Sequence, residues 1–236
     1  MNLYKEHTNR ELLSVFEERQ ALTYEAQIQL KDEILYRKLA LDVKDLNNTI
    51  AEKSEAIKNL EYLKDLGYKS TGLEDTVRII RMTKASILDI VAIVLGVVLS
   101  YFGLVRFIKI IFGFVGDAPF DLMAFLSDGA VVVIGYIGFN MLSGFKRLID
   151  HMGFELLSEK GFVRLKKRFD LTLETKEFKP EEVAIEINGG EIVLSLGNVP
   201  VITGSSDNLI QRMTIEELAL RIKNNEEVQE DEQEEA

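Results

Sequence analysis

The sequence predicts a membrane α+β protein with an N-terminal helical or coiled-coil segment, a two-helix transmembrane hairpin and a small C-terminal cytoplasmic β-meander with a helix. The first glycine is Gly67 and the first proline is Pro119, so nothing before residue 67 has to break a helix. Residues 86–145 contain two apolar runs of membrane-spanning length. Beyond residue 161, apolar and charged side chains alternate as they do in half-buried strands.

The charge distribution separates the apolar segment from the rest of the chain. The 236 residues include 28 Lys and Arg against 39 Asp and Glu, a formal net charge of -11. This balance argues against general nucleic-acid binding, so no nucleic acid is expected as a partner. The absence of cysteine excludes disulfides and thiolate chemistry. Six charged residues fall within 86–145: Asp89, Arg106, Lys109, Asp117, Asp121 and Asp128.

Residues 1–70 are predicted to form a helical or coiled-coil module. Thr8 and Glu11 have the spacing of a capping box, and the apolar residues that follow give a first helix one apolar face. A second helix is expected to start at Thr23. About the first 40 residues resemble a helical pair that precedes the spans of some uncharacterised bacterial membrane proteins, a resemblance that carries no activity with it.

A heptad pattern begins at Tyr36 and favours pairing with another helix. That helix is either in a second copy, which gives a homo-oligomer through the N-terminal helices, or within residues 8–35 of the same chain. The sequence leaves both alternatives open. One core position takes Tyr36, Val43, Ile50 and Ile57, and the other takes Leu39, Leu46, Lys53 and Leu60.

Residues 86–145 are interpreted as a transmembrane hairpin with spans at 87–105 and 124–142, because about 20 helical residues cross ~30 Å of hydrocarbon. Membrane lipid is therefore an expected partner. A ridge of small residues allows another helix to approach the first span closely, and the second span is favoured over a second copy for this contact. The ridge consists of Ala92, Gly96 and Ser100.

The connecting segment 106–121 is predicted to lie along the membrane surface, because it is too apolar for a solvated loop and Gly113, Gly116 and Pro119 interrupt it. The first ten residues contain no secretory signal. Basic residues on the outer flanks of the hairpin place both termini in the cytoplasm, and the expected location is a bacterial inner membrane. These residues are Arg78, Arg81 and Lys84 before the first span, and Lys146 and Arg147 after the second.

Asp128 admits two interpretations. A carboxylate near the membrane surface, with Arg106 or Lys109 as a cationic neighbour, is favoured over an ion or proton site inside the membrane. Asp89 lies at the opposite end of the hairpin, so the two carboxylates are not expected to form a catalytic pair. Asn140 is interpreted as an interhelical hydrogen-bonding group.

The residues after the hairpin divide into three parts. A juxtamembrane amphipathic helix is predicted for 146–160, a small α+β domain for 161–224 and an acidic tail for 225–236. The domain has a strand at 163–173, whose basic face is expected in solvent rather than on anionic lipid. The remaining signals are a hairpin turn at Asn188-Gly189-Gly190, a further turn at Gly197-Asn198, and a final helix that starts at Thr214.

No catalytic, cofactor-binding or metal-ligating residues are predicted, since phosphate-binding, dinucleotide, metalloprotease and nucleophile motifs are all absent from the sequence. Asp150 and His151 are adjacent on a helix and point in different directions, which argues against a dyad. The expected function is therefore a non-enzymatic, membrane-anchored scaffold or regulatory protein with an unidentified protein partner. The alternative is a small oligomeric channel or membrane-permeabilising protein, with Asp128, Asn140 and the glycines of the second span lining a pore.

Overall fold

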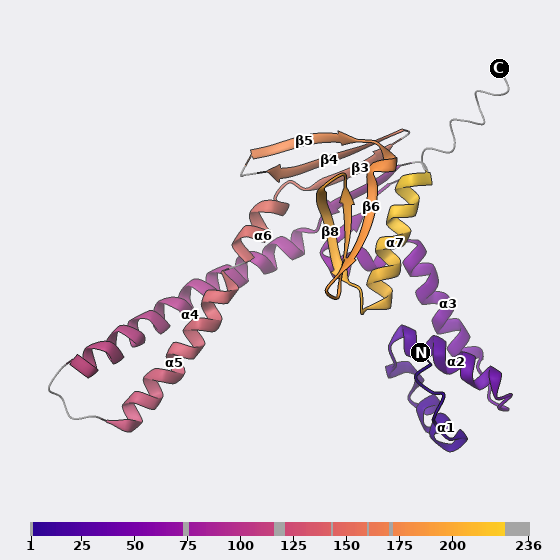
Figure 1. The fold of residues 1–236 in the computed structure, drawn as a ribbon, viewed down its shortest axis with the longest axis horizontal. Helices are drawn as coiled ribbons and strands as arrows, with labels where there is room; N and C mark the ends of the chain where they lie inside the picture. The colour runs from indigo at the N-terminus through magenta and orange to yellow at the C-terminus, as the bar shows by residue number, and fades with distance from the viewer. Residues whose placement is uncertain are drawn as a thin grey trace. The chain divides into compact units, whose positions relative to one another are not determined.

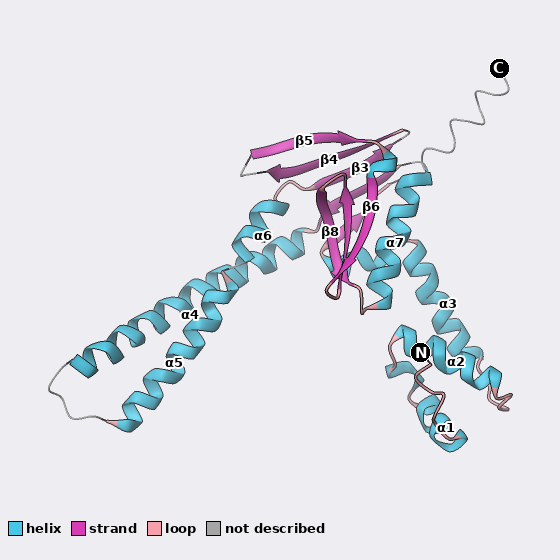
Figure 2. Cartoon of the chain, in the orientation of Figure 1, coloured by secondary structure: helices cyan, strands magenta, loops and turns pink. Residues whose placement is uncertain are grey.

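A computed structural model describes residues 2–72, 76–115, 121–142, 144–159, 161–169 and 172–224. It combines helices with two β-sheets, so the α+β class is confirmed (Figures 1 and 2). The chain divides into two compact units. Unit 1 comprises Met1–Arg78, Leu157–Val163 and Phe178–Ala236, and unit 2 comprises Ile79–Leu156 and Arg164–Glu177.

The described helices are α1 (Asn9–Glu17), α2 (Tyr24–Tyr36), α3 (Lys44–Lys58), α4 (Thr83–Val115), α5 (Leu122–Met141), α6 (Gly144–His151) and α7 (Leu209–Asn224), with short 3-10 turns η1 (Arg19–Ala21), η2 (Glu61–Leu66) and η3 (Pro180–Glu182). One sheet has the order β1 (Tyr68–Ser70), β2 (Val77–Arg81), β3 (Glu155–Glu159), β4 (Phe162–Phe169) and β5 (Thr172–Phe178). The other has the order β6 (Val183–Asn188), β7 (Glu191–Leu196) and β8 (Val199–Ser205).

The first two helices begin where the sequence predicts. The backbone N–H of Thr8 donates to Glu11 Oε2 over 2.6 Å, and the N–H of Glu11 donates to Thr8 Oγ1 over 3.3 Å, which completes the capping box of α1. The side chain of Thr23 accepts a hydrogen bond from the N–H of Ala26 and starts α2. These bonds satisfy backbone donors that the first turn of a helix leaves unpaired.

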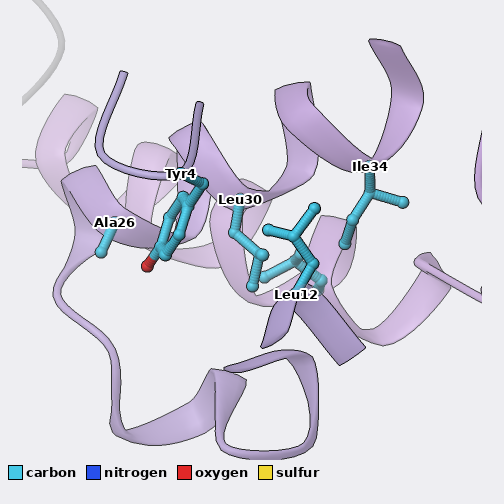
Figure 3. Close-up of a cluster of buried hydrophobic side chains, with 6 residues drawn as sticks. Tyr4, Leu12, Ala26, Leu30 and Ile34 are labelled. Atoms are coloured by element: carbon cyan, nitrogen blue, oxygen red, sulfur yellow. The ribbon is translucent and has the colours of Figure 1, made fainter. Parts of the chain in front are cut away.

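Buried apolar side chains hold α1, α2 and α3 together in unit 1 (Figure 3). Leu12, Leu30 and Leu46 come one from each helix and have no exposed surface. Burial of a leucine side chain contributes about 1.5–3 kcal/mol, so the three leucines stabilise the packing of these helices. Its members are Tyr4, Leu12, Ala26, Leu30, Ile34 and Leu46.

Arg37 joins the end of α2 to the start of the chain. Its guanidinium donates to the carbonyl oxygens of Tyr4, Lys5 and His7 over 3.1, 3.0 and 2.6 Å. Its Nε lies 2.6 Å from the Glu33 carboxylate, which compensates the half-buried positive charge. The arginine thereby satisfies backbone acceptors of a segment that has no regular structure.

The heptad prediction is wrong for residues 37–43, which are not helical. α2 ends at Tyr36 and α3 begins at Lys44, and between them Lys38 has a φ of 53°, a conformation that does not continue a right-handed helix. The chain reverses there, and α3 packs on α2. Packing inside the chain therefore accounts for six of the eight heptad residues, whereas self-association stays a prediction. Leu46, Ile57 and Leu60 are buried, and Leu39, Val43 and Ile50 are partly buried against the cluster.

The predicted β-meander is confirmed for β6, β7 and β8, which pair antiparallel in chain order. Asn188 pairs with Glu191 across the first turn, and Gly189 and Gly190 have φ values of 58° and 88°. A two-residue turn of this kind requires positive φ at both positions, which glycine adopts without steric cost. Gly197, with a φ of 56°, begins the second turn.

Helix α7 packs against all three strands of this meander, but it begins earlier than the sequence predicts. The Oδ1 atom of Asn208 accepts from the N–H groups of Ile210 and Gln211 over 3.1 and 3.3 Å, so the helix starts at Leu209. Thr214, the predicted start, lies inside the helix and donates its hydroxyl to the Ile210 carbonyl over 2.7 Å. The buried core between helix and strands contains Ile192, Leu194, Ile202, Ile215, Leu218 and Ile222.

The helix predicted for 146–160 is shorter than expected. α6 ends at His151, and Gly153 has a φ of 80°, which turns the chain out of the helix and into β3. Leu156, expected on the apolar face of a helix, is a buried strand residue instead. The strand predicted for 163–173 corresponds to β4 and the first residues of β5, with residues 170 and 171 outside the described ranges.

The two apolar segments of unit 2 form helices that pack side by side (Figure 1). α4 contains 33 residues, and both it and the segment that starts with α5 are long and apolar enough to cross a membrane. The segment predicted to connect the spans, 106–121, is helical over 106–115, because α4 continues through them; 116–120 lie outside the described residues, and the placement of the segment along the membrane surface stays a prediction. Gly113 does not end α4, since one interior glycine costs only about 1 kcal/mol.

Candidate functional site

Glycines line the contact between α4 and α5, and they allow the two backbones to approach. A Cβ atom built on Gly103 would lie 2.5 Å from the Cα of Gly135, and one built on Gly96 would lie 2.8 Å from the carbonyl oxygen of Gly138. Both distances are too short for a side chain, so these positions require glycine. The prediction that the small-residue ridge faces the second span is thus confirmed at Gly96, and the Gly103–Gly135 contact extends it by two turns.

Large apolar side chains cover the outside of the same hairpin. Val94, Phe102 and Tyr136 are among the exposed ones. In a water-soluble protein the largest apolar patches are usually only a few hundred Å² in area, because exposed apolar surface promotes association. The hairpin has the opposite arrangement, with small residues inside and large apolar residues outside, which suits a surrounding of lipid chains.

Asp128 forms a cluster of three charges with Arg106 and Lys109 of α4. Its Oδ1 lies 2.9 Å from Arg106 Nη1 and its Oδ2 lies 2.9 Å from Lys109 Nζ. Arg106 and Lys109 are three positions apart, so they lie on one face of α4. Only 6% of the surface of Asp128 is exposed. The side chains of Arg106 and Lys109 have 46% and 58% of their surface exposed. The predicted pairing with a cationic neighbour is confirmed for both candidates.

A second ion pair lies toward the opposite end of α4. Arg81, at the end of β2, places its Nη2 atom 3.0 Å from Asp89 Oδ2, and both side chains are almost entirely buried. Burial of a charged pair is tolerated when each charge has a close partner. No local sequence pattern indicates this pair, because Arg81 precedes the helix and has no periodic relation to Asp89.

The two ion pairs are separated by an uncharged band. Residues 90–105 contain no charged side chain; these sixteen positions correspond to about 24 Å along the helix axis at 1.5 Å per residue. Residues 129–145, which follow Asp128, also contain no charged side chain. The length of this band is close to the ~30 Å thickness of a bilayer hydrocarbon core. Long charged side chains at its ends can extend to the membrane surface and make up the difference in length.

Asn140 and His151 are not part of either ion pair. Asn140 lies in α5 as an exposed residue, so its interhelical hydrogen bond stays a prediction. The ring of His151 lies 6.1 Å from the ring of Phe154, centroid to centroid. In the described part of the chain, no three His, Asp or Glu side chains are grouped so that they could hold a metal ion.

The basic strand β4 is partly engaged within unit 2. Arg164 Nη2 lies 2.9 Å from Glu177 Oε1, and Arg168 Nη2 lies 3.7 Å from Met152 Sδ. Burial lowers the pKa of Lys167, and the negative charge of Asp150 opposes that effect. Arg164 and Arg168 of the basic face thus have partners within unit 2, and the exposure of that face to solvent or to lipid stays a prediction.

Comparisons with protein-family models, with curated proteins and with solved structures found no match for this chain.

Proposed function

We propose that this chain is a non-enzymatic, membrane-anchored scaffold or regulatory protein of a bacterial inner membrane. The α4–α5 hairpin is the anchor, and the helical and β-rich parts are cytoplasmic interaction modules for an unidentified protein partner. One observation carries the proposal: the hairpin packs its glycines inward and turns its large apolar side chains outward. This arrangement is favourable in lipid and unfavourable in water.

The charges are consistent with this anchor. A membrane register that places the uncharged band in the hydrocarbon core puts Asp89 near one surface and Asp128 near the other. Each carboxylate then has a cationic partner at the membrane–water interface, which reduces the free-energy cost of placing a charge in the membrane. The basic flanks of the hairpin favour the orientation with both termini in the cytoplasm.

The same cluster argues against a cation channel. In a pore that selects cations, a lining carboxylate attracts the ion because its own charge is uncompensated. Both oxygens of Asp128 already contact cations of this chain, Arg106 and Lys109, and the carboxylate is buried. A permeating cation would have to compete with two fixed positive charges, so the scaffold is the better supported of the two functions.

Site-specific photo-crosslinking tests the scaffold proposal. A photoreactive residue at Tyr36, which is 83% exposed on α2, should give a discrete adduct with a second protein in native membranes. The matched control is the same residue at Val94, which is exposed on α4 and should give lipid adducts only. Membrane-inserted protein that yields no protein adduct from Tyr36, or from Leu220 on α7, would contradict the proposal.

Ion flux through purified protein in liposomes tests the channel alternative. The scaffold account predicts no cation current for the wild type and none for Asp128→Asn at equal insertion. Asp128→Asn should leave membrane insertion intact, because its neighbours Arg106 and Lys109 are exposed enough to be hydrated. A reproducible wild-type cation current that falls in Asp128→Asn would replace the scaffold with the channel.

A further inference from the structure

The cluster of Arg106, Lys109 and Asp128 is not electrically neutral. Two positive charges share one negative charge, so one positive charge is left over on an otherwise apolar helical surface. Each carboxylate oxygen contacts one cation, and each cation retains further N–H donors. The next carboxylate of the described part of α5 is the capping residue Asp121, about 10 Å away along the helix axis. Its Oδ1 accepts from the N–H groups of Met123 and Ala124.

We propose that Arg106 and Lys109 together bind the phosphate of an anionic phospholipid, in the leaflet nearest the end of α4 and the start of α5. This inference rests on the membrane anchor proposed above and names a ligand for it. The two cations are one helical turn apart on one face of α4 and leave about half of their surface exposed. A phosphate between them receives charge-assisted hydrogen bonds from both.

The surroundings of the cluster favour a lipid over a free anion. Phe102 and Val105 precede the cations on α4, and Phe112 follows them; all three are exposed apolar side chains. Acyl chains lie along such a surface while their headgroup meets the charges at the end of the uncharged band. A net negative lipid neutralises the remaining positive charge, whereas a zwitterionic lipid does not, so the site should prefer phosphatidylglycerol to phosphatidylcholine.

Quenching of a single tryptophan by brominated lipids measures this preference. The chain contains no tryptophan, so Phe107→Trp, an exposed position between the two cations, introduces one reporter. The full chain is reconstituted with brominated phosphatidylglycerol or brominated phosphatidylcholine at equal mole fraction. We expect the anionic lipid to be preferred by roughly three- to tenfold in relative association constant.

Three variants of the reporter protein decide the origin of any preference. Arg106→Gln/Lys109→Gln/Asp128→Asn removes all three charges together, including the excess positive charge, and should abolish the preference. Asp128→Asn alone leaves both cations uncompensated and should strengthen it. Lys84→Gln, at the far end of α4, should leave it unchanged and controls for general attraction of anionic lipid to basic residues.

Each remaining outcome has a distinct meaning. Equal quenching by the two lipids in the Phe107→Trp protein would overturn the inference and leave the membrane anchor intact. Absence of quenching by either lipid would place the hairpin outside the membrane and overturn the proposed function as well. If inorganic phosphate removes the preference, the site binds a free anion and the lipid assignment is wrong.

Discussion

At the start of α1, the Glu11 carboxylate accepts hydrogen bonds from the backbone N–H and the hydroxyl of Thr8 over 2.6 and 2.9 Å. These bonds stabilise the charged form and lower the pKa of Glu11, with the backbone bond as the largest cause. Because the folded pKa is lower than the unfolded one, this contribution to stability is present above about pH 4.3 and is lost as the pH falls through the folded pKa.

Glu11→Gln should therefore destabilise the protein at pH 7 and have a smaller effect at pH 3. Glutamine keeps an oxygen that accepts the Thr8 bonds, so the substitution removes only the part that depends on charge. Circular dichroism melts of the full chain in mild detergent measure the difference, with Glu17→Gln on the same helix as the matched control. An equal shift in melting temperature at both pH values would contradict the capping assignment.

The predictability of individual side chains depends on how far apart their partners lie in the chain. Thr8 and Glu11 are three residues apart, and a local spacing rule identifies them. The pairing of Asp128 with α4 follows from the approximate depth of each residue in two spans. The hydrogen bonds from Arg37 to the carbonyl oxygens of Tyr4, Lys5 and His7 join positions separated by 30 or more residues, and nothing in the local sequence indicates them.

Among the elements, the α4–α5 pair depends most directly on single glycines. A methyl group on Gly103 or Gly135 would meet the opposite backbone and force the helices apart. We expect Gly103→Ala and Gly135→Ala each to destabilise the hairpin by about 1–3 kcal/mol, the usual cost of overpacking. Gly129→Ala on α5 is the matched control, because a Cβ there has nothing within 4 Å.

Thermal unfolding in a mild detergent provides the measurement. Gly103→Ala and Gly135→Ala should unfold at lower temperature than the wild type, and Gly129→Ala should unfold at the same temperature or higher, since alanine favours helix. If all three substitutions behave alike, the close contact between the helices is wrong, and helix propensity alone determines the response.

The boundaries of elements are where sequence reasoning fails most. Leu148, Ile149, Met152 and Leu156 fit one face of a helix, yet the helix stops at His151 and Leu156 belongs to a strand. The heptad residues likewise fit one continuous helix, although the chain reverses after Tyr36. A periodic apolar pattern indicates which residues are buried. The buried residues of two successive elements can share one period by coincidence and then look like a single helix. Turns with two glycines were predictable because they require positive φ.

Across the whole molecule, two uncharged runs of the hairpin contrast with a strongly acidic chain. The net charge of -11 is carried outside residues 90–105 and 129–145, which contain no charged residue. We propose that these residues cross the membrane twice and leave both termini in the cytoplasm. Because the chain contains no cysteine, a single introduced thiol reports the exposure of one position.

Labelling of three single-cysteine variants with a membrane-impermeant maleimide tests this claim most directly. The positions are Tyr36 on α2, Met123 beside the turn of the hairpin and Leu220 on α7, all exposed on the protein surface. In intact cells, Met123→Cys should be labelled, whereas Tyr36→Cys and Leu220→Cys should react only after permeabilisation. Labelling of Tyr36→Cys or Leu220→Cys in intact cells, or equal labelling of all three, would contradict the account.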